Sequence, residues 1–336
     1  MPDLNIPCKL FCLFFGEVVT PHYGRKEQEM NYEDTLKEIV LGDERFVVMT
    51  AENRSAVRNI PAALGDRFID VGIAEQSMVG IAAGLALRGR IPVVHALSAF
   101  LTMRAFEFIR TDTGIAGLPI KLVGAFPGFL SEANGPTHQA IEDIALMRGI
   151  PAMEVFCPSD EEDMIIGLEA ILKSPGPSYI RFNDLEASVE HDRDFHTGRA
   201  EVISRGEDIT ILAYGTLFRE ADRAVSLLEA EGKSVGLINL RTLKPIDEET
   251  IIKAAMQTSL LVTVEDHLLA GGLFSILGEI FLRHNVTCRV LPFGLDERWF
   301  RPAMLQDILE YEGLTGEKIA DKILKESEKY AEYIKV

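Results

Sequence analysis

Residues 68–97 read FIDVGIAEQSMVGIAAGLALRGRIPVVHAL, and this stretch decides the fold class. The apolar runs at residues 68–71 and 91–97 have the length and composition of buried strands. The small-residue segment between them, residues 76–87, predicts a helix. Two strands joined by a crossover helix form a βαβ unit, whose strands are parallel. The stretch therefore predicts a parallel α/β sheet with helices on its faces.

The alternation of strands and helices extends along most of the chain. Around residues 68–97 we expect further elements at residues 32–40, 45–50, 100–111, 120–125, 141–147, 151–156 and 160–172. A polar stretch at residues 183–197 shows no apolar periodicity and is typical of a linker. A second alternation follows at residues 208–213, 219–231, 234–240, 248–256, 260–264, 272–284, 288–292 and 318–334. The sequence therefore predicts an α/β protein of two domains, with an N-terminal extension at 1–28, a first domain at 29–185, a linker at 186–197 and a smaller second domain at 198–336.

Composition and charge exclude several classes of function. The 336 residues include 34 Lys and Arg against 52 Asp and Glu, which gives a net charge of −18. Phosphate backbones and anionic lipids repel such a chain, so we expect neither a nucleic-acid nor a membrane partner. The four cysteines fit neither a disulfide framework nor a zinc site, which favours a reducing compartment. The apolar run at residues 10–15 is too short for a membrane span and lacks a signal-peptide cleavage site, so we expect a cytoplasmic protein.

Three loop segments carry candidate functional residues. Glu75 follows a predicted strand and opens a helix, at the edge where open α/β sheets bind ligands. His138 ends a rigid Gly-Pro-Thr-His turn, and histidine side chains suit acid–base chemistry near neutral pH. Taken singly, Glu75 is equally a first-turn charge that stabilises its helix, and His138 an ordinary surface residue. The third segment contains the aromatic residues Phe100, Phe106 and Phe108. Taken singly, each of them is better explained as part of the core-facing side of a helix.

Taken together, four motifs resemble those of the transketolase family. They are GIAEQ at residues 72–76, GPTHQAIEDIALMR at 135–148, LKPID at 243–247 and VEDHLLAGGL at 264–273. The resemblance runs from about residue 30 to 315. It implies a thiamine diphosphate pyrimidine-binding domain followed by a transketolase C-terminal domain. It is strongest to split transketolases, in which these two domains form a separate polypeptide.

The resemblance implies a cofactor, thiamine diphosphate, and residues that hold its pyrimidine ring. Glu75 matches the carboxyl group that hydrogen-bonds the ring nitrogen and activates the cofactor. Phe100, Met103 and Phe106 match the side chains that pack against the ring, with methionine in place of one family aromatic. Catalysis would then be covalent and would proceed through the cofactor.

The resemblance also implies substrate contacts, with several departures. His138 matches a histidine that contacts a substrate hydroxyl and assists proton transfer. Arg181 matches an arginine that binds a sugar phosphate, and Ser55 falls near a second phosphate contact. The departures are Phe126 in place of a substrate histidine, Asn134 in place of an acid, and Met30 in place of a phosphate-binding arginine, with Arg25 nearby. These changes predict a substrate pocket that differs from that of pentose-phosphate transketolases.

One family motif is absent from this chain. Thiamine diphosphate enzymes bind Mg²⁺ with a Gly-Asp-Gly motif and an asparagine downstream, and no Gly-Asp-Gly occurs in the 336 residues. We therefore expect the cofactor to be shared with a partner, an N-terminal transketolase-type subunit that carries the motif and the Mg²⁺. An α2β2 heterotetramer with the active site at the subunit interface is the expected assembly.

The leading hypothesis is a transketolase-like subunit that moves a two-carbon ketol unit from a ketose, with or without a phosphate, to an aldehyde. Two other thiamine enzymes remain alternatives: a 1-deoxyxylulose-phosphate synthase-like enzyme, whose group also lacks the histidine replaced by Phe126, and a 2-oxoacid dehydrogenase beta subunit. Activity with pyruvate as donor would favour these two. An alternative of another class is a non-catalytic assembly or regulatory subunit, against which the retention of Glu75 and His138 argues.

Overall fold

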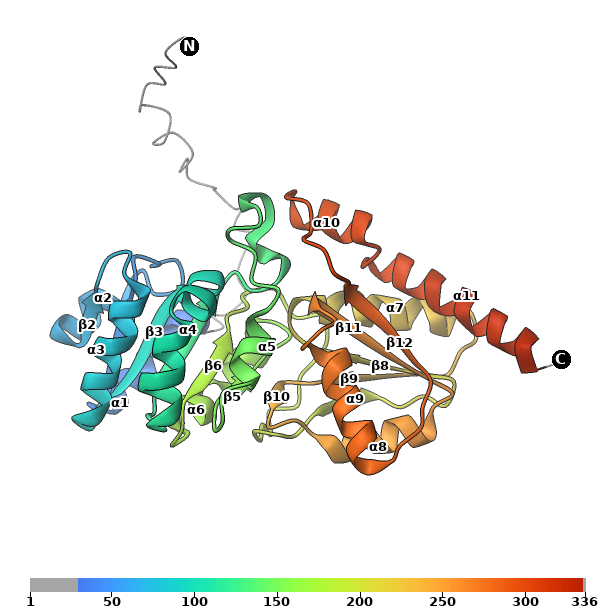
Figure 1. Ribbon diagram of the computed structural model, residues 1–336, viewed down its shortest axis with the longest axis horizontal. Helices are drawn as coiled ribbons and strands as arrows, with labels where there is room; N and C mark the ends of the chain where they lie inside the picture. The colour runs from blue at the N-terminus through green and yellow to red at the C-terminus, as the bar shows by residue number, and fades with distance from the viewer. Residues whose placement is uncertain (1–29, 335–336) are drawn as a thin grey trace, which may run out of the picture. The chain divides into compact units, whose positions relative to one another are not determined.

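A computed structural model describes residues 30–334, with side chains to residue 327. Residues from Asn31 onward form one compact unit, and the expected N-terminal extension, including Arg25, lies outside the described residues. This unit contains two sheets, each with helices on both faces (Figure 1). The predicted α/β fold is confirmed.

The first sheet has seven strands in the order β10-β5-β6-β4-β3-β1-β2. All neighbours are parallel except β10, which runs antiparallel to β5. β1 and β4 are buried at every residue because helices cover both faces, and this is why their sequences are continuous apolar runs. The strands are β1 (Phe46–Thr50), β2 (Phe68–Asp70), β3 (Ile91–Leu97), β4 (Lys121–Ala125), β5 (Glu154–Phe156), β6 (Ser178–Arg181) and β10 (Thr242–Lys244).

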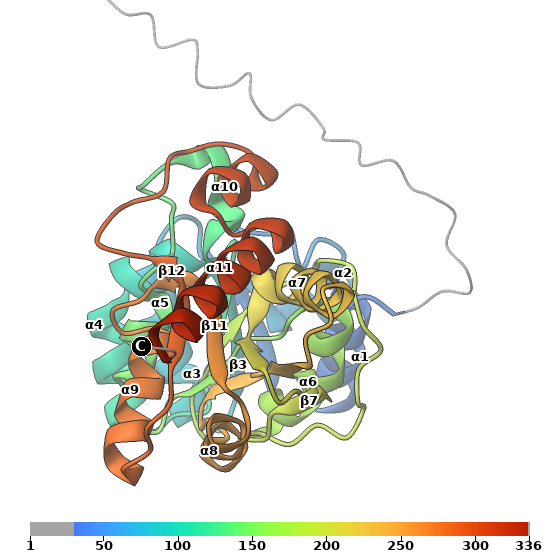
Figure 2. The same cartoon turned by 90° about the vertical axis from the view of Figure 1, so that its right-hand side faces the viewer.

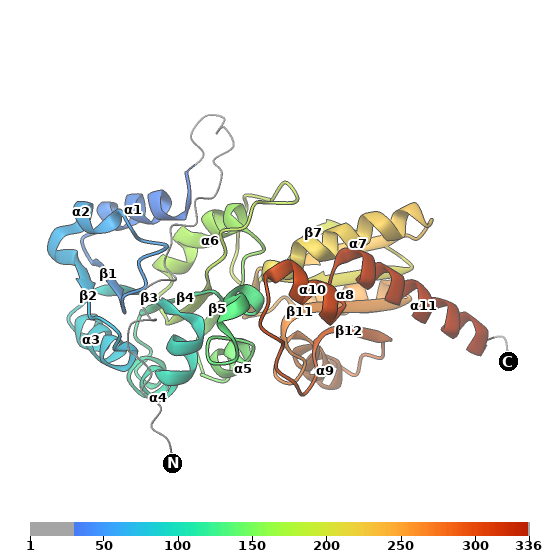
Figure 3. The same cartoon turned by 90° about the horizontal axis from the view of Figure 1, so that it is seen from above.

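Helices cover the first sheet on both sides, as Figure 3 shows from above. One face packs against α1 (Tyr32–Gly42), α2 (Ile60–Leu64) and α6 (Glu161–Lys173). The other face packs against α3 (Glu75–Leu87), α4 (Phe106–Phe108) and α5 (Asp143–Arg148). Asn31 and Asp160 begin α1 and α6 with side chains that accept hydrogen bonds from backbone N–H groups in the first turn.

The second sheet has five strands in the order β12-β11-β8-β9-β7, with only β7 antiparallel to its neighbour. Its strands are β7 (Glu201–Ser204), β8 (Ile209–Ala213), β9 (Val235–Asn239), β11 (Leu260–Leu268) and β12 (Val290–Leu295). On one face α7 (Phe218–Ala230) and α11 (Gly316–Ile334) lie side by side (Figure 2). The other face packs against α8 (Glu248–Gln257) and α9 (Leu273–His284), while α10 (Leu305–Glu312) precedes α11.

The predicted helix at residues 100–111 is wrong in detail. The segment contains two π-helical turns, Phe100–Arg104 and Ile109–Ile115, on either side of the short α4. The hydroxyl groups of Thr102 and Thr111 donate to carbonyls four residues earlier, which is a contact that distorts regular helices. Such π-helical turns occur most often at functional sites.

Five short elements were not predicted from the sequence: α2, β6, β7, β10 and α10. The most consequential is β10, because it lies in the second half of the chain yet pairs with β5 of the first sheet. The Lys244 ammonium group then donates to the carbonyl of Arg148 at 2.8 Å and to that of Ile150. One apolar core also runs from the α3 face of the first sheet to α8 and α9 of the second. The two halves are therefore tightly joined.

Among the described residues, none of the helices has both the length and the apolar character needed to cross a bilayer.

Candidate active site

Four predicted site residues follow the carboxyl ends of neighbouring parallel strands. Ser55 comes after β1, Glu75 after β2, Phe100 after β3 and Phe126 after β4. β1 and β3 are adjacent, but the chain leaves β1 toward β2 and leaves β3 toward β4. Open α/β sheets bind ligands at the switch point that such a divergence creates. The structure therefore brings these four positions to one edge of the sheet, where the sequence had placed Glu75.

Glu75 is the first residue of α3 and is only 2% exposed. The turn before it is closed by Gly72, which has a positive φ of 69°. The amino end of the helix stabilises a negative charge at this position. Among the described residues, the donor to its carboxylate is Arg104, whose Nη1 lies 3.1 Å from Oε2. Glu75 is thus a buried carboxylate whose arginine partner is 42% exposed.

Phe100 links this carboxylate to His138. The Arg104 guanidinium carbon lies 4.1 Å from the centre of the Phe100 ring. On another side, the His138 ring packs edge-on against Phe100, with 5.0 Å between ring centres. Glu75, Arg104, Phe100 and His138 therefore form one continuous constellation. Sequence reasoning missed Arg104, although its spacing of four residues from Phe100 places the two on one helical face.

The other two residues predicted to hold the cofactor differ from each other in accessibility. Met103 is 37% exposed beside the constellation. Phe106 is partly buried and packs against the core under the first sheet. Of the predicted aromatic pair, Phe100 is the one seen in contact with both Arg104 and His138.

His138 lies on a loop that is closed at its base. A β-bridge joins Gly128 to Ala140, and the buried Gln139 amide donates to the Phe300 carbonyl at 2.9 Å. The His138 backbone N–H donates to the Gly135 carbonyl, and its Nδ1 lies 2.9 Å from the Thr137 hydroxyl. Among residues 30–334 no hydrogen-bond partner is found for Nε2, so that nitrogen is available to a ligand.

The remaining predicted substrate residues are Phe126 and Asn134, on the segment that leads to this loop, and Ser55, which follows β1. Phe126 is 44% exposed and has a positive φ of 55°, a strained conformation for a bulky residue and one that clusters at functional sites. Asn134 is exposed, and its amide donates to the Ser131 carbonyl at 2.9 Å. Ser55 is exposed and donates to the Asn53 side chain at 2.8 Å. All three side chains are accessible.

Arg181 requires a correction. Its side chain is 2% exposed, with Nε 2.9 Å from an Asp143 oxygen and Nη1 2.6 Å from an Asp266 oxygen. The two carboxylates raise the pKa of Arg181 and outweigh its burial, which acts in the opposite direction. The predicted phosphate contact is therefore wrong here, because the guanidinium is enclosed and paired. Its partner Asp266 was not foreseen, since it lies on β11 of the second sheet. Arg181 joins the two halves of the protein.

The predicted linker holds a second buried cluster. His191 Nε2 lies 2.7 Å from Asp160, and Nδ1 lies 2.8 Å from Glu201. Burial lowers the pKa of His191, but the hydrogen bonds to these two carboxylates outweigh it and raise the pKa to about 10. Asp163 and Glu201 are also within 2.7–2.9 Å of the Arg241 guanidinium. Asp163, His191 and Glu201 are close enough to bind a metal ion. However, the histidine and Arg241 already supply positive charge, so the cluster is better suited to joining the linker to both sheets.

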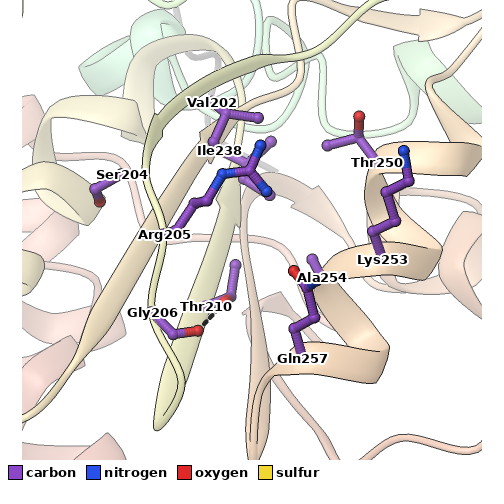
Figure 4. Close-up of a pocket in the computed structure, with 10 residues that line it drawn as sticks. All are labelled: Val202, Ser204, Arg205, Gly206, Thr210, Ile238, Thr250, Lys253, Ala254 and Gln257. Atoms are coloured by element: carbon purple, nitrogen blue, oxygen red, sulfur yellow. Dashed lines mark hydrogen bonds between the residues drawn. The ribbon is translucent and has the colours of Figure 1, made fainter.

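A separate pocket lies in the second domain, between the end of β7 and α8 (Figure 4). Arg205 and Lys253 are the charged residues that line it, and none of the predicted site residues contributes. Lys253 is paired with Glu249 one turn earlier on α8. The strand-end constellation, rather than this pocket, therefore contains the predicted chemistry.

Comparison with known proteins identifies the family. Residues 28–187 match the transketolase pyrimidine-binding domain, and residues 198–319 match the transketolase C-terminal domain. The chain belongs to the transketolase family. The resemblance noted in the sequence is confirmed, as is the order of the two family domains.

Individual relatives place the chain more closely within the transketolase family. The 6-deoxy-6-sulfo-D-fructose transketolase subunit SqwH of a Clostridium species is 36% identical over 292 residues, which cover 86% of this chain and 90% of that protein. The 1-deoxy-D-xylulose-5-phosphate synthase of Heliobacterium modesticaldum is 35% identical over 90% of this chain, which spans 47% of that protein. A structure titled split gene transketolase, inactive beta4 tetramer, has a TM-score of 0.80 at 33% identity and covers 88% of this chain and 96% of that one.

Proposed function

We propose that this chain is the C-terminal subunit of a split, thiamine diphosphate-dependent transketolase that transfers a two-carbon ketol unit from a ketose to an aldehyde. The observation that carries the proposal is the constellation at the strand ends. A buried carboxylate, Glu75, opens a helix beside Phe100, and His138 packs against the same ring. Similarity to a transketolase subunit and to a split transketolase structure supports the assignment.

The residues present suit the pyrimidine ring of thiamine diphosphate. Glu75 is a buried acceptor whose partner is a planar, cationic N–H donor, and that donor lies over an aromatic ring. An aminopyrimidine is likewise planar and offers nitrogen donors, so Glu75 and Phe100 would bind it. When bound, the cofactor supplies a thiazolium group that stabilises a carbanion. Transketolase-family and 1-deoxyxylulose-phosphate synthase relatives support this cofactor.

The remaining chemistry falls to this chain's own side chains. Glu75 would accept a hydrogen bond from the protonated ring nitrogen at its carboxylate, where burial strengthens the hydrogen bond and the α3 amino end stabilises the negative charge. His138 would donate or accept a substrate proton through Nε2, because Nδ1 is bonded to Thr137. Phe126, Asn134 and Ser55 would contact the substrate from the accessible rim. Arg181 is not included among the substrate contacts.

A partner subunit is the second part of the proposal. The chain lacks Gly-Asp-Gly, so we assign the Mg²⁺ and the diphosphate to a partner chain that carries this motif, in an α2β2 heterotetramer. The similar split transketolase structure is titled an inactive beta4 tetramer, which supports a requirement for the other subunit. We also propose a cytoplasmic location, in line with the acidic charge and with Cys157 and Cys288, which are free thiols.

The substrate is proposed only by class, as a small ketose with or without an acidic group. The SqwH relative is named for 6-deoxy-6-sulfo-D-fructose, and the departures at Phe126 and Asn134 are compatible with a donor other than a pentose phosphate. A 1-deoxyxylulose-phosphate synthase-like reaction is the second candidate, because Phe126 replaces the histidine that this group also lacks. The two are distinguished by the donor, a ketose in one case and pyruvate in the other.

Reconstitution with the partner tests the proposal. The pair should transfer two carbons from at least one ketose in a panel that includes phosphorylated, sulfonated and neutral sugars, with pyruvate as the alternative donor. Glu75→Ala should reduce turnover by at least about 100-fold, the range for loss of a positioned acid or base. Glu38→Ala, an exposed site on α1, is the matched control. Unchanged turnover in Glu75→Ala would show that this chain does not carry the activating carboxylate.

A further inference from the structure

Arg104 makes the two contacts that the proposed function assigns to the pyrimidine ring. Its Nη1 donates to the Glu75 carboxylate at 3.1 Å, and its guanidinium carbon lies 4.1 Å from the centre of the Phe100 ring. The first contact occupies one carboxylate oxygen of Glu75, Oε2, and the second covers a face of the aromatic ring. Both surfaces that would receive the ring are therefore already in use within the chain.

The chemistry of the two groups is similar. A guanidinium is planar, carries delocalised positive charge and presents N–H donors at its edge. An aminopyrimidine that bears a proton on its ring nitrogen has the same three properties. Both stack on aromatic faces, the guanidinium with additional cation–π attraction. The same carboxylate oxygen and the same ring face can therefore accept either group, and the two groups compete for that position.

We propose that Arg104 is an internal substitute for the aminopyrimidine, which pairs with Glu75 when no cofactor is bound and is displaced when the cofactor binds. This inference rests on the proposed function and deepens it. Without a partner, Glu75 would be a charge that is 2% exposed and uncompensated, which is costly. Arg104 removes that cost, and the cofactor replaces one planar cationic partner with another.

The surroundings of Arg104 allow it to leave. Its side chain is 42% exposed, and among the described residues its contacts are Glu75 and Phe100. It lies at the end of the π-helical turn Phe100–Arg104, where the regular hydrogen-bond ladder of a helix is interrupted. When the cofactor takes its place beside Glu75, the half-exposed arginine returns to water. In the described part of the chain, no buried group other than Glu75 loses a hydrogen-bond partner in this exchange. Displacement therefore costs the Arg104 contacts and little else.

Calorimetric titration of the reconstituted complex with thiamine diphosphate and Mg²⁺ tests the inference without measuring turnover. Arg104→Met keeps the aliphatic bulk and removes the competitor, so the dissociation constant should fall by about three- to tenfold, the range for one lost polar contact of about 0.7–1.4 kcal/mol. Arg104→Lys, which keeps the charge but not the planar fork, should fall between the two. Arg110→Met is the control, because Arg110 is exposed on the same segment.

The outcomes separate this inference from the proposed function. The wild-type complex could bind thiamine diphosphate while Arg104→Met binds it equally or more weakly. That result would overturn the role of Arg104 and leave the proposed cofactor in place. No binding by the wild-type complex would overturn both. A second measurement uses the cofactor-free chain: Glu75→Gln and Arg104→Met should be non-additive in urea denaturation because they break one pair. Additive effects would show that the pair does not form in solution, and the inference would fail.

Discussion

Replacing His191 with glutamine should remove a large pH dependence from the stability of this chain. The imidazole lies between Asp160 and Glu201, at 2.7 and 2.8 Å, and its side chain is fully enclosed. Glutamine has a similar reach and can keep a hydrogen bond, but it carries no charge at any pH. The substitution therefore isolates the charge of His191 from its hydrogen bonding.

The magnitude follows from the raised pKa. A rise from 6.5 to about 10 corresponds to at most about 5 kcal/mol of folding free energy, at about 1.4 kcal/mol for each tenfold change in proton affinity. Because the pKa is higher in the folded state, this contribution is complete below pH 6.5. It decreases as the pH rises from 6.5 and is lost near pH 10. Glutamine keeps part of the bonding, so we expect His191→Gln to cost about 2–4 kcal/mol at pH 6.

Urea denaturation of the wild-type chain and of His191→Gln, at intervals from pH 6 to pH 10, measures the effect. The difference between the two proteins should narrow by roughly 1 kcal/mol per pH unit through the middle of this range. Groups that do not interact with His191 titrate alike in both proteins and cancel in the difference. His196→Gln is the control, since His196 is 63% exposed beside Asp194. A difference in stability that stayed constant from pH 6 to pH 10 would refute the assignment of a charged histidine at this position.

Three further predictions concern the junction between the sheets and the substrate rim. Arg181→Met should lower the free energy of unfolding by about 3–5 kcal/mol, because it leaves the Asp143 and Asp266 carboxylates buried without a partner; a loss below about 1 kcal/mol in urea would contradict this. Gly128→Ala should destabilise the chain by about 1–3 kcal/mol, because φ is +55° at this position and an added Cβ would overlap the Asp266 carboxylate. An unchanged melting temperature would show that the loop can shift freely. Phe126→His, which restores the family histidine, should raise kcat/KM for pentose phosphates by about three- to tenfold, equivalent to one substrate hydrogen bond; steady-state assays in which this ratio fell for pentose phosphates and for other ketoses alike would argue against a specificity role.

Much of the site could be predicted because it depends on short-range patterns. The apolar run at residues 91–97 and the Glu75 junction specify a βαβ unit, and the carboxyl ends of neighbouring parallel strands share one edge. The approach of Glu75 and Phe100 to one edge follows from that geometry, whereas His138 reaches Phe100 from a loop beyond the strand ends. The rest of the site depends on contacts that no local pattern contains. Arg104 contacts Glu75 across 29 positions of sequence, from a π-helical turn where the sequence predicted a regular helix.

Arg181 shows why residue matching alone was insufficient. Its position at the end of β6 is the kind of position from which a side chain can reach a substrate. Its burial is set by Asp266, 85 positions away in the second sheet, and by Asp143 at the start of α5. The environment of His191 could not be predicted either. A polar stretch without periodicity predicts a linker, but it does not reveal that carboxylates from β7 and from the start of α6 enclose this histidine. Long-range packing decided both.

The edge strand β10 has a consequence for dividing this protein experimentally. A fragment that ended in the polar stretch before residue 198 would keep six strands of the first sheet but would leave the backbone N–H and C=O groups of β5 without their partner strand. Exposed edges of this kind promote pairing with other chains and aggregation. Limited proteolysis in the polar stretch should therefore yield two pieces that stay associated under native conditions. Fragments for crystallography or for partner mapping should retain the chain at least through Lys244.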